Sequence, residues 1–336
     1  MIIQLPLSSL FAGIGFITLA FSLIKIWHWI RIYARRSGLS RYAHSSLSGE
    51  EPWALVTGAS DGVGKAFAKE LAANGFNVVL HGRNPEKLKR VASELRTTFA
   101  RRSFRTLVAD AGDVGCAVHP STFPSDPASE PAALDFAAIA AELHDLHLTV
   151  LINNAGGARF IPDYAPVLAT PESVITEIVS LNALFPLHLM RALLPKLAQH
   201  QPSLVLNVSS MADQGLPLNA CYSGSKALLM SLTRALRLEM AMEKGLADVE
   251  LLGVRFGRVT GAAGFTDAPS LFVPSTEIMA RAALARAGHD NGVVVGYWGH
   301  ALIEASTLLF AIMPQWLQDK IIIDTMRASK ETWGRE

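Results

Sequence analysis

Short apolar runs alternate with longer segments of helical spacing along this chain, and the alternation restricts its fold more than any other feature. Residues 53–57 form an apolar run that stops at a glycine, and residues 63–74 then carry apolar side chains at helical spacing. The further strands predicted in this way are 77–80, 104–109, 148–152, 204–208 and 249–254, and the further helices are 85–100 and 134–146. Strands and helices that alternate at these lengths predict βαβ units and a parallel sheet covered on both faces.

The composition excludes several other classes of protein. The chain has 336 residues, of which 50% are hydrophobic and 18% charged, so it is neither disordered, nor a coiled coil, nor collagen-like. Its two cysteines, Cys116 and Cys221, are too few for a disulfide framework, and their neighbours do not indicate a metal site. A hydrophobic core must therefore hold the fold together, and no metal is expected.

The net charge of +1 is unevenly distributed along the chain. Residues 1–49 contain five basic residues and no acidic one, so the remainder carries a net negative charge. A nucleic-acid-binding domain would carry its positive charge on the folded part, so we expect no nucleic-acid partner. A basic N-terminal segment followed by a mildly acidic remainder indicates a protein that associates with a membrane instead.

The N-terminal segment has the length and composition of a membrane anchor. Residues 1–24 contain no charged side chain, and residues 5–24 supply 20 mostly apolar positions, enough for a helix to cross the hydrocarbon core. A cleaved signal peptide is the alternative, but the stretch lacks a basic start and a small-residue cleavage site. The basic residues that follow should keep that end in the cytosol, together with the body of the protein.

The turn after the first predicted strand is rich in glycine. Its sequence is Thr57-Gly-Ala-Ser-Asp-Gly-Val-Gly64. Glycines allow a tight exit from the strand and a close approach of the backbone to a pyrophosphate, which the amides of the next helix then meet. The alternative is a tight turn with no ligand.

The second predicted strand ends without the acidic residue that is typical of NAD sites. It runs into His81-Gly-Arg-Asn84, which places Arg83 where it could contact the 2′-phosphate of NADP. A solvated surface arginine is the alternative interpretation of Arg83.

A serine pair and a tyrosine–lysine pair are the candidates for catalysis. Ser209 and Ser210 end the fifth predicted strand, and Tyr222 and Lys226 lie four residues apart at the start of a helix, so the latter two share one face. An ammonium beside a phenol favours the phenolate and lowers the tyrosine pKa, which makes tyrosine a usable general acid or base. Such a pair also occurs by chance on surfaces, but the serines and the glycine turn favour catalysis.

Together these motifs resemble the short-chain dehydrogenase/reductase family over about residues 53–261. The family's T-G-x-x-x-G-x-G is matched at 57–64, its N-N-A-G at 153–156 and its Y-x-x-x-K at 222–226. The resemblance implies one α/β domain, a Rossmann-like doubly wound parallel sheet of about seven strands, and NAD(P)-dependent hydride transfer to a carbonyl. The cofactor-binding residues that it implies are Thr57, Gly58, Ser60, Asp61, Gly62, Val63, Gly64, Arg83, Asp110, Asn154, Ala155, Gly156, Tyr222, Lys226 and Val259.

The same resemblance implies roles for the catalytic residues. Tyr222 donates the proton, Lys226 lowers its pKa and binds the nicotinamide ribose, and Asn182 holds a water in the proton relay. A serine steadies the substrate carbonyl. The family's usual spacing of 13 residues back from the tyrosine gives Ser209, whereas alignment on the strand gives Ser210. We favour Ser210, because loops accept deletions more easily than buried strands do.

Two segments depart from the family pattern. The family's P-G-x-V-x-T appears as Phe256-Gly-Arg-Val-Thr-Gly261, so we expect a looser nicotinamide side of the pocket, with Val259 still placed to hold the carboxamide. Residues 112–131 are rich in Pro, Ser, Gly and Asp and exceed the usual loop length. We interpret them as a mobile surface insertion without a chemical role.

Within the family, the chain resembles the membrane-bound very-long-chain 3-oxoacyl-CoA reductases and the related 17β-hydroxysteroid dehydrogenases of the endoplasmic reticulum. The features concerned are the N-terminal span, Asp61, Pro162, and the tail motifs at 296–302 and 314–316. They imply reduction of a 3-oxoacyl-CoA by NADPH in fatty-acid elongation. The alternatives are a carbonyl reductase of steroids, retinoids or secondary metabolites, and a catalytically silent, membrane-anchored partner subunit, against which the intact Tyr222, Lys226 and Asn182 argue.

The expected organisation has four parts. They are a membrane anchor at 1–30, a basic juxtamembrane linker at 31–50, an NADP-binding catalytic domain at 51–296 and an apolar extension at 297–336. Within the extension, residues 305–318 are uncharged but too short to span, so we expect an interfacial or substrate-covering helix, or else a buried core helix. The expected partners are a lipophilic substrate and the membrane, and a homo-oligomer is left open.

Overall fold

The structure is a computed structural model that describes residues 7–114, 134–157, 166–262, 265–266, 268–311 and 313–333. The chain divides into two compact units, Met1–Ser37 and Gly38–Glu336, which we describe separately. Pro162 and most of the expected insertion at 112–131 lie outside the described residues.

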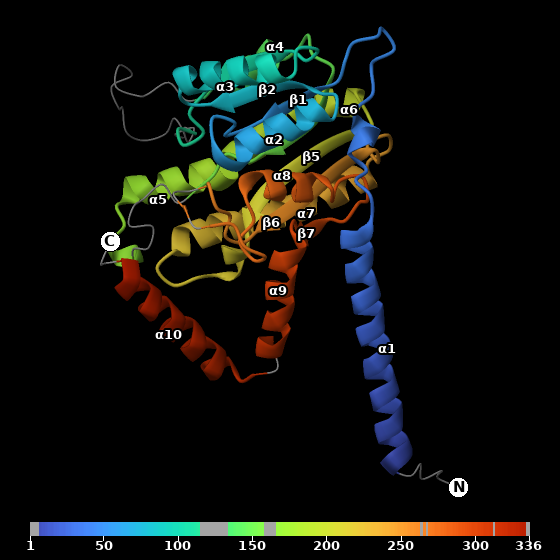
Figure 1. Cartoon of the computed structure of the whole chain (residues 1–336), viewed down its shortest axis with the longest axis vertical. Coiled ribbons are helices and arrows are strands. Elements are labelled where there is room, and N and C mark those ends of the chain that lie inside the picture. Colours follow the sequence, from blue (N-terminus) through green and yellow to red (C-terminus); the bar gives the residue numbers. More distant parts are fainter. Residues whose placement is uncertain are drawn as a thin grey trace, which may run out of the picture. The chain divides into compact units, whose positions relative to one another are not determined.

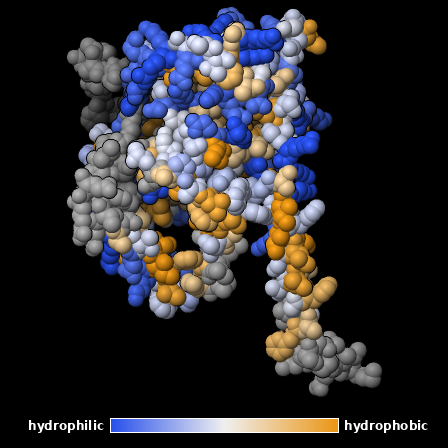
Figure 2. All heavy atoms as spheres, viewed as in Figure 1, coloured by the Kyte–Doolittle hydropathy of each residue, from blue (hydrophilic) through white to orange (hydrophobic). Residues whose placement is uncertain are grey.

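The described part of the first unit forms one long helix. Helix α1 (Leu7–Ala34) has 28 residues, which corresponds to a length of about 42 Å. Its segment Phe11–Ala34 is apolar and long enough to cross a membrane, and none of its hydrophobic window is buried. Apolar side chains gather along this helix (Figure 2). Phe16, for example, is 73% exposed. A second segment, Glu172–Gln199, has a similar length and hydropathy, but half of its window is buried, as is typical of a core helix.

The second unit is built on a seven-stranded parallel sheet with the order β3-β2-β1-β4-β5-β6-β7 (Figure 1). The strands are β1 (Trp53–Val56), β2 (Asn77–Gly82), β3 (Phe104–Val108), β4 (Leu148–Asn153), β5 (Ser203–Ser210), β6 (Val249–Phe256) and β7 (Val293–Val295). The strand order reverses between β1 and β4, and in open parallel sheets ligands bind at such a point, outside the carboxyl ends of the strands. The prediction of a doubly wound parallel sheet is confirmed.

Helices cover both faces of this sheet. The helices of the second unit are α2 (Gly62–Ala73), α3 (Pro85–Thr98), α4 (Phe136–Glu142), α5 (Glu172–Val179), α6 (Phe185–Gln199), α7 (Ala220–Met242), α8 (Thr276–Leu284), α9 (Trp298–Ala311) and α10 (Gln315–Trp333), and they do not all lie on the sheet. On one face, Phe256 of β6 stacks on Phe67 of α2 with ring centroids 6.4 Å apart. Leu251 of the same strand belongs to the core cluster on the other face, as the alternation of side chains along a strand requires.

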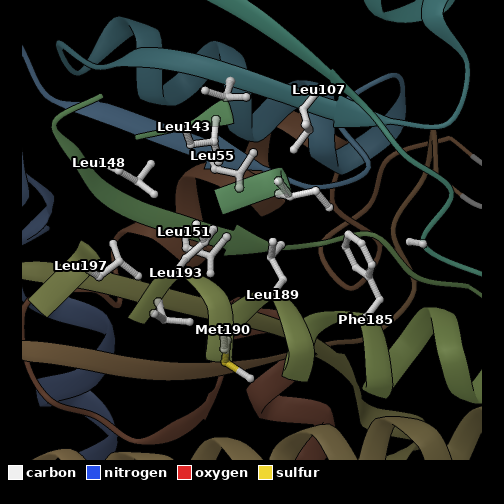
Figure 3. Packing of buried hydrophobic residues seen from close by; sticks show 14 of the residues in the cluster. Leu55, Leu107, Leu143, Leu148, Leu151, Phe185, Leu189, Met190, Leu193 and Leu197 are labelled. Carbon is white, nitrogen blue, oxygen red and sulfur yellow. The ribbon is translucent and has the colours of Figure 1, made fainter. Parts of the chain in front are cut away.

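That core cluster joins α4 and α6 to the centre of the sheet (Figure 3). Leu55 of β1 and Leu151 of β4 are fully buried in it, and Leu189 of α6 packs against them. Burial of each such side chain contributes about 1.5–3 kcal/mol to folding. The cluster packs against β1 and β4, so it holds in place the two strands whose carboxyl ends border the ligand crevice.

Part of the expected juxtamembrane linker is folded. A short 3-10 helix, η1 (Leu39–Tyr42), carries two buried side chains, and the hydroxyl of Tyr42 donates to the carboxylate of Glu250. That carboxylate also accepts the N–H of Gly288 at 2.8 Å, and the N–H of Gly38 donates to the carbonyl of Ala287 at 3.1 Å. These contacts explain why the second compact unit begins at Gly38.

The apolar C-terminal stretch differs from the expectation. Residues 305–318 include the end of α9 and the start of α10, so the single helix that we expected there is wrong. The break falls beside Pro314, which has no N–H to continue a helix. Within this stretch Ala305 is exposed and Trp316 is 66% exposed, so the alternative of a buried core helix is wrong as well.

Candidate active site

The turn at the carboxyl end of β1 is rich in glycines, whose backbone no side chain covers. Gly58 and Gly62 have φ angles of +66° and +55°, which favour glycine. A Cβ at Gly64 would lie 2.1 Å from the carbonyl oxygen of Gly58, so no larger residue fits there. The side chain of Asp61 accepts the N–H of Gly62 at 2.7 Å and caps α2. The start of α2 therefore faces the crevice with closely packed backbone, as a pyrophosphate site needs.

A single hydroxyl joins the two strands at the switch point. Oγ1 of the buried Thr57 accepts the N–H groups of Asn154 and Ala155, each at 2.9 Å. The Asn154 side chain donates in return to the carbonyl of Thr57 at 3.0 Å. These hydrogen bonds fix Thr57 and the N-N-A-G motif relative to each other, at the base of the crevice between the ends of β1 and β4.

Arg83 and Asp110 meet at the ends of neighbouring strands. Arg83 follows β2 and Asp110 lies just beyond β3, and the closest charged atoms of the two side chains are 4.0 Å apart. The Arg83 side chain is 61% exposed, so it is accessible to an anion. Asp110 also accepts the N–H of Gly112 at 2.9 Å, which closes a tight turn.

The ammonium of Lys226 is buried beside the Tyr222 ring. Its Nζ donates to the carbonyl of Val208 at 2.9 Å and lies 5.9 Å from the centroid of the tyrosine ring. Burial lowers the pKa of Lys226 from 10.5 to about 8, which leaves the group mainly protonated at neutral pH. Tyr222 is half-buried at the start of α7, so a positive charge lies next to an accessible phenol.

Asn182 is held in a one-turn π-helix, η3 (Ser180–Leu184), between α5 and α6. Its Nδ2 donates to the carbonyls of Ile178 and Gly157, both at 2.9 Å, and its Oδ1 accepts the N–H of Gly157 at 3.0 Å. A π-turn inside a helix is frequent at functional sites, because it redirects one residue out of the helical register.

Gly156 lies where Asn182 and Lys226 converge. A Cβ added at Gly156 would be 2.8 Å from Oδ1 of Asn182 and 2.8 Å from Nζ of Lys226. The missing side chain keeps the approach to both polar atoms open. The structure thus brings together residues that are separated by 70 positions in the sequence.

The two serines at the end of β5 have different surroundings. Ser209 is buried, and its hydroxyl donates to the carbonyl of Lys226 at 3.2 Å. Ser210 is half-buried, and its Oγ accepts the N–H of Ala212 at 3.1 Å at the start of the short helix η4 (Met211–Gln214). Successive residues of a strand face opposite sides, so only one of the two can face the substrate.

Hydrogen bonds hold the loop after β6 in place. Val259 is buried, and the N–H of Thr260 donates to the carbonyl of Pro274 at 3.1 Å. The N–H of Gly257 donates to the ring of His300 at 3.0 Å. These contacts hold the loop that carries Val259, and the expectation of a looser nicotinamide side of the pocket stays a prediction.

Sequence reasoning missed the groups that orient the candidate catalytic side chains. The carbonyl of Val208 holds Lys226, and the backbone of Gly157 holds Asn182. Main-chain groups leave no residue-specific pattern, so no sequence signal could have found them. His300 was within a motif that we noted, but its contact with the loop after β6 requires the fold.

The described residues fit a dinucleotide. The turn at Gly58 and Gly64 is packed too closely for a Cβ at either position, it leads into the start of α2, and an exposed arginine follows the neighbouring strand. Among the described residues, no group of three or more His, Cys, Asp or Glu side chains could hold a metal ion.

Comparison with known proteins agrees with this geometry. The family model described as short chain dehydrogenase matches residues 52–118 and 121–261. A protein of Emericella nidulans named very-long-chain 3-oxoacyl-CoA reductase is 28% identical over 319 residues, which cover 91% of this chain and 85% of that protein. A protein of the same name from Aspergillus fumigatus is 34% identical over 260 residues, which cover 75% of this chain and 68% of that protein.

Solved structures show the same fold. A short-chain dehydrogenase from Sphingobium yanoikuyae, solved in complex with NADPH, superposes with a TM-score of 0.58 and 24% identity. The match covers 79% of this chain and 97% of that protein. The sheet and the helices around it are thus shared with an experimentally determined structure.

Proposed function

Because the chain belongs to the short-chain dehydrogenase family, we propose that it is an NADPH-dependent reductase that converts a 3-oxoacyl-CoA to a 3-hydroxyacyl-CoA in fatty-acid elongation. The observation that carries the catalytic part is the buried Lys226 ammonium beside the accessible Tyr222, at the edge of the sheet where the glycine turn opens. The substrate is supported by the names of relatives that match the chain at about 30% identity.

The proposed cofactor site follows the carboxyl ends of the central strands. The residues that would hold NADPH are Thr57, Gly58, Ser60, Asp61, Gly62, Val63, Gly64, Arg83, Asp110, Asn154, Ala155, Gly156, Tyr222, Lys226 and Val259. When bound, NADPH supplies the hydride for the carbonyl carbon. Arg83 would pair with the 2′-phosphate, because its exposed guanidinium presents donors in the geometry that phosphate accepts.

In the proposed mechanism, Tyr222 gives its phenolic proton to the oxygen of the reduced carbonyl. The nearby Lys226 charge favours the phenolate that results, which lowers the barrier to the proton transfer. Ser210 would donate a hydrogen bond to the carbonyl oxygen from the open end of β5. Oδ1 of Asn182 has a second lone pair, which can hold a water that returns the proton.

Replacement of Arg83 by aspartate should change cofactor preference. The variant loses a charge-assisted contact and places a negative charge beside the 2′-phosphate, so we expect at least tenfold weaker NADPH binding, on the order of 1.4 kcal/mol or more. NADH binding should change much less. Titration of both cofactors measures the effect, and an unchanged NADPH-to-NADH preference would remove Arg83 from the site.

Three substitutions test the proton donor and the choice of serine. Tyr222→Phe should lower kcat by a factor of about 100 or more with nearly unchanged NADPH binding, since only the proton-donating hydroxyl is lost. Ser210→Ala should cost far more activity than Ser209→Ala. The reverse order in steady-state kinetics would assign the carbonyl contact to Ser209 and refute our alignment on the strand.

We also propose that the chain is anchored in the endoplasmic reticulum membrane by one span, with its catalytic part in the cytosol. The support is the apolar, exposed helix α1 and the basic residues that follow its apolar stretch. The full chain should stay in the membrane pellet after an alkaline carbonate wash, whereas a chain that starts near Gly38 should be released. Full-length protein in the wash supernatant would refute the anchor.

The substrate assignment rests on how an anchored enzyme meets its ligand. A long acyl chain partitions into the bilayer and leaves its CoA head in water, so a site near the cytosolic surface can take the reacting carbonyl from the interface. We expect kcat/KM of detergent-solubilised protein for 3-oxoacyl-CoA to rise with acyl length in an NADPH-oxidation assay. Steroids and retinoids serve as the comparison, and turnover of a 17-keto steroid without turnover of any 3-oxoacyl-CoA would overturn the proposal.

A further inference from the structure

Helix α9 follows the last strand of the sheet, and its first two turns contact the edge where the candidate site lies. His300 and Glu304 are four residues apart on α9, so they share one face of the helix. On the basis of the function proposed above, we propose that His300 is a positioning residue for the nicotinamide half of the cofactor site. In this proposal Glu304 holds α9, and therefore His300, in place.

His300 makes two hydrogen bonds to the loop after β6. Its Nδ1 accepts the N–H of Gly257 at 3.0 Å, and its Nε2 contacts the carbonyl of Arg258 at 3.0 Å. This pair of contacts defines one neutral tautomer, with the proton on Nε2. The imidazole is fully buried, and burial lowers the pKa of His300, so the neutral ring that these bonds require is the favoured form.

The loop and the ring fit each other closely. A Cβ at Gly257 would lie within 2.9–3.1 Å of three atoms of the His300 ring, so the contact requires glycine at this position. The next residues in the chain lead to the buried Val259, the proposed contact of the nicotinamide carboxamide. The family pattern has a proline at position 256, where this chain has phenylalanine. The two hydrogen bonds of His300 restrict the backbone of this loop, as a proline at position 256 would otherwise do.

Glu304 ties α9 to the sheet through Arg255. The carboxylate of Glu304 pairs with the guanidinium of Arg255, which lies on β6 directly opposite Ser209 of β5. A second contact of the same guanidinium reaches Asp213 at 3.7 Å, and the Asp213 side chain is only 4% exposed. Partly buried ion pairs fix the geometry of the elements that they join, even where they add little net stability. This pair therefore fixes the turn of α9 that follows His300.

Cofactor fragments separate positioning of the nicotinamide from a general loss of fold. NADPH contains the nicotinamide, whereas 2′-phospho-ADP-ribose lacks it but keeps the adenine, both ribose units and all the phosphates. His300→Ala in the full-length, detergent-solubilised chain should weaken NADPH binding about tenfold, the equivalent of about 1.4 kcal/mol. Binding of 2′-phospho-ADP-ribose should change less than twofold.

Two further variants examine how the effect arises. His300→Gln keeps a donor for the Arg258 carbonyl, so it should recover part of the NADPH affinity that His300→Ala loses. Glu304→Gln should weaken NADPH about threefold, and the combined His300→Ala, Glu304→Gln chain should bind NADPH no more weakly than His300→Ala alone. Such non-additivity is expected when one residue acts through another.

Matched controls are available at a distance from this site. His144→Gln alters an exposed histidine at the amino-terminal edge of the sheet, and Asp324→Asn removes an exposed charge on α10. Both controls should bind the two ligands as the unaltered chain does. Equal weakening of both ligands by His300→Ala, or no change in NADPH affinity, would overturn the proposal. Failure of the unaltered chain to bind either ligand would instead refute the proposed cofactor.

Discussion

The hydrogen bonds of Thr57 connect the fold to the site more directly than any other interaction described here. One buried hydroxyl accepts two consecutive N–H groups from the N-N-A-G segment, and so it joins β1 to β4 where the strand order reverses. Strands that diverge at such a point leave a crevice, and a crevice is useful only if its two sides keep their spacing. Asn154 donates one hydrogen bond to the Thr57 hydroxyl and another to the Thr57 carbonyl, so the glycine turn after β1 and the N-N-A-G segment after β4 are fixed relative to each other. The core cluster on one face of the sheet packs against both strands and keeps them in place.

The second constraint is the buried ammonium of Lys226. Burial of a charge is costly unless polar groups surround it, and here the carbonyl of Val208 and the gap left by Gly156 accommodate it. The depressed pKa of Lys226 expresses that cost. A lysine in this position is unfavourable for stability alone, and in the mechanism proposed above its value lies in the field that it creates at the phenol of Tyr222. Asn182 is similar, since its π-turn disrupts a regular helix in order to bring one amide to Gly157.

Much of the fold could be predicted from the sequence, because local patterns determine it. The apolar run before Gly58 and the helical spacing from Val63 gave a strand, a turn and a helix close to those observed. One part that local patterns could not predict is the folded start of the second unit, which depends on contacts distant in sequence. Nothing near Tyr42 indicates that Glu250, more than 200 positions later, accepts a hydrogen bond from its hydroxyl. The tail was misread because hydrophobic composition was given more weight than Pro314, which ends the continuous hydrogen-bond pattern of a helix. The residues of the candidate site were chosen from motifs, and their roles stay predictions, although Asn182, Gly156 and Lys226 do converge.

The C-terminal helices raise the question of where the functional domain ends. The family model stops at residue 261, yet the loop at Gly257 and Arg258 is held by His300, which lies beyond that limit. The match to the Emericella nidulans reductase covers 91% of this chain, so it extends well beyond the family model. A loop that lacks the family's proline has more conformations to lose when it closes on a ligand, and a contact from outside the shared domain can reduce that entropy in advance. In this view the tail of the chain is a structural part of the proposed cofactor site, because α9 carries both His300, which holds the loop after β6, and exposed apolar side chains such as Leu302.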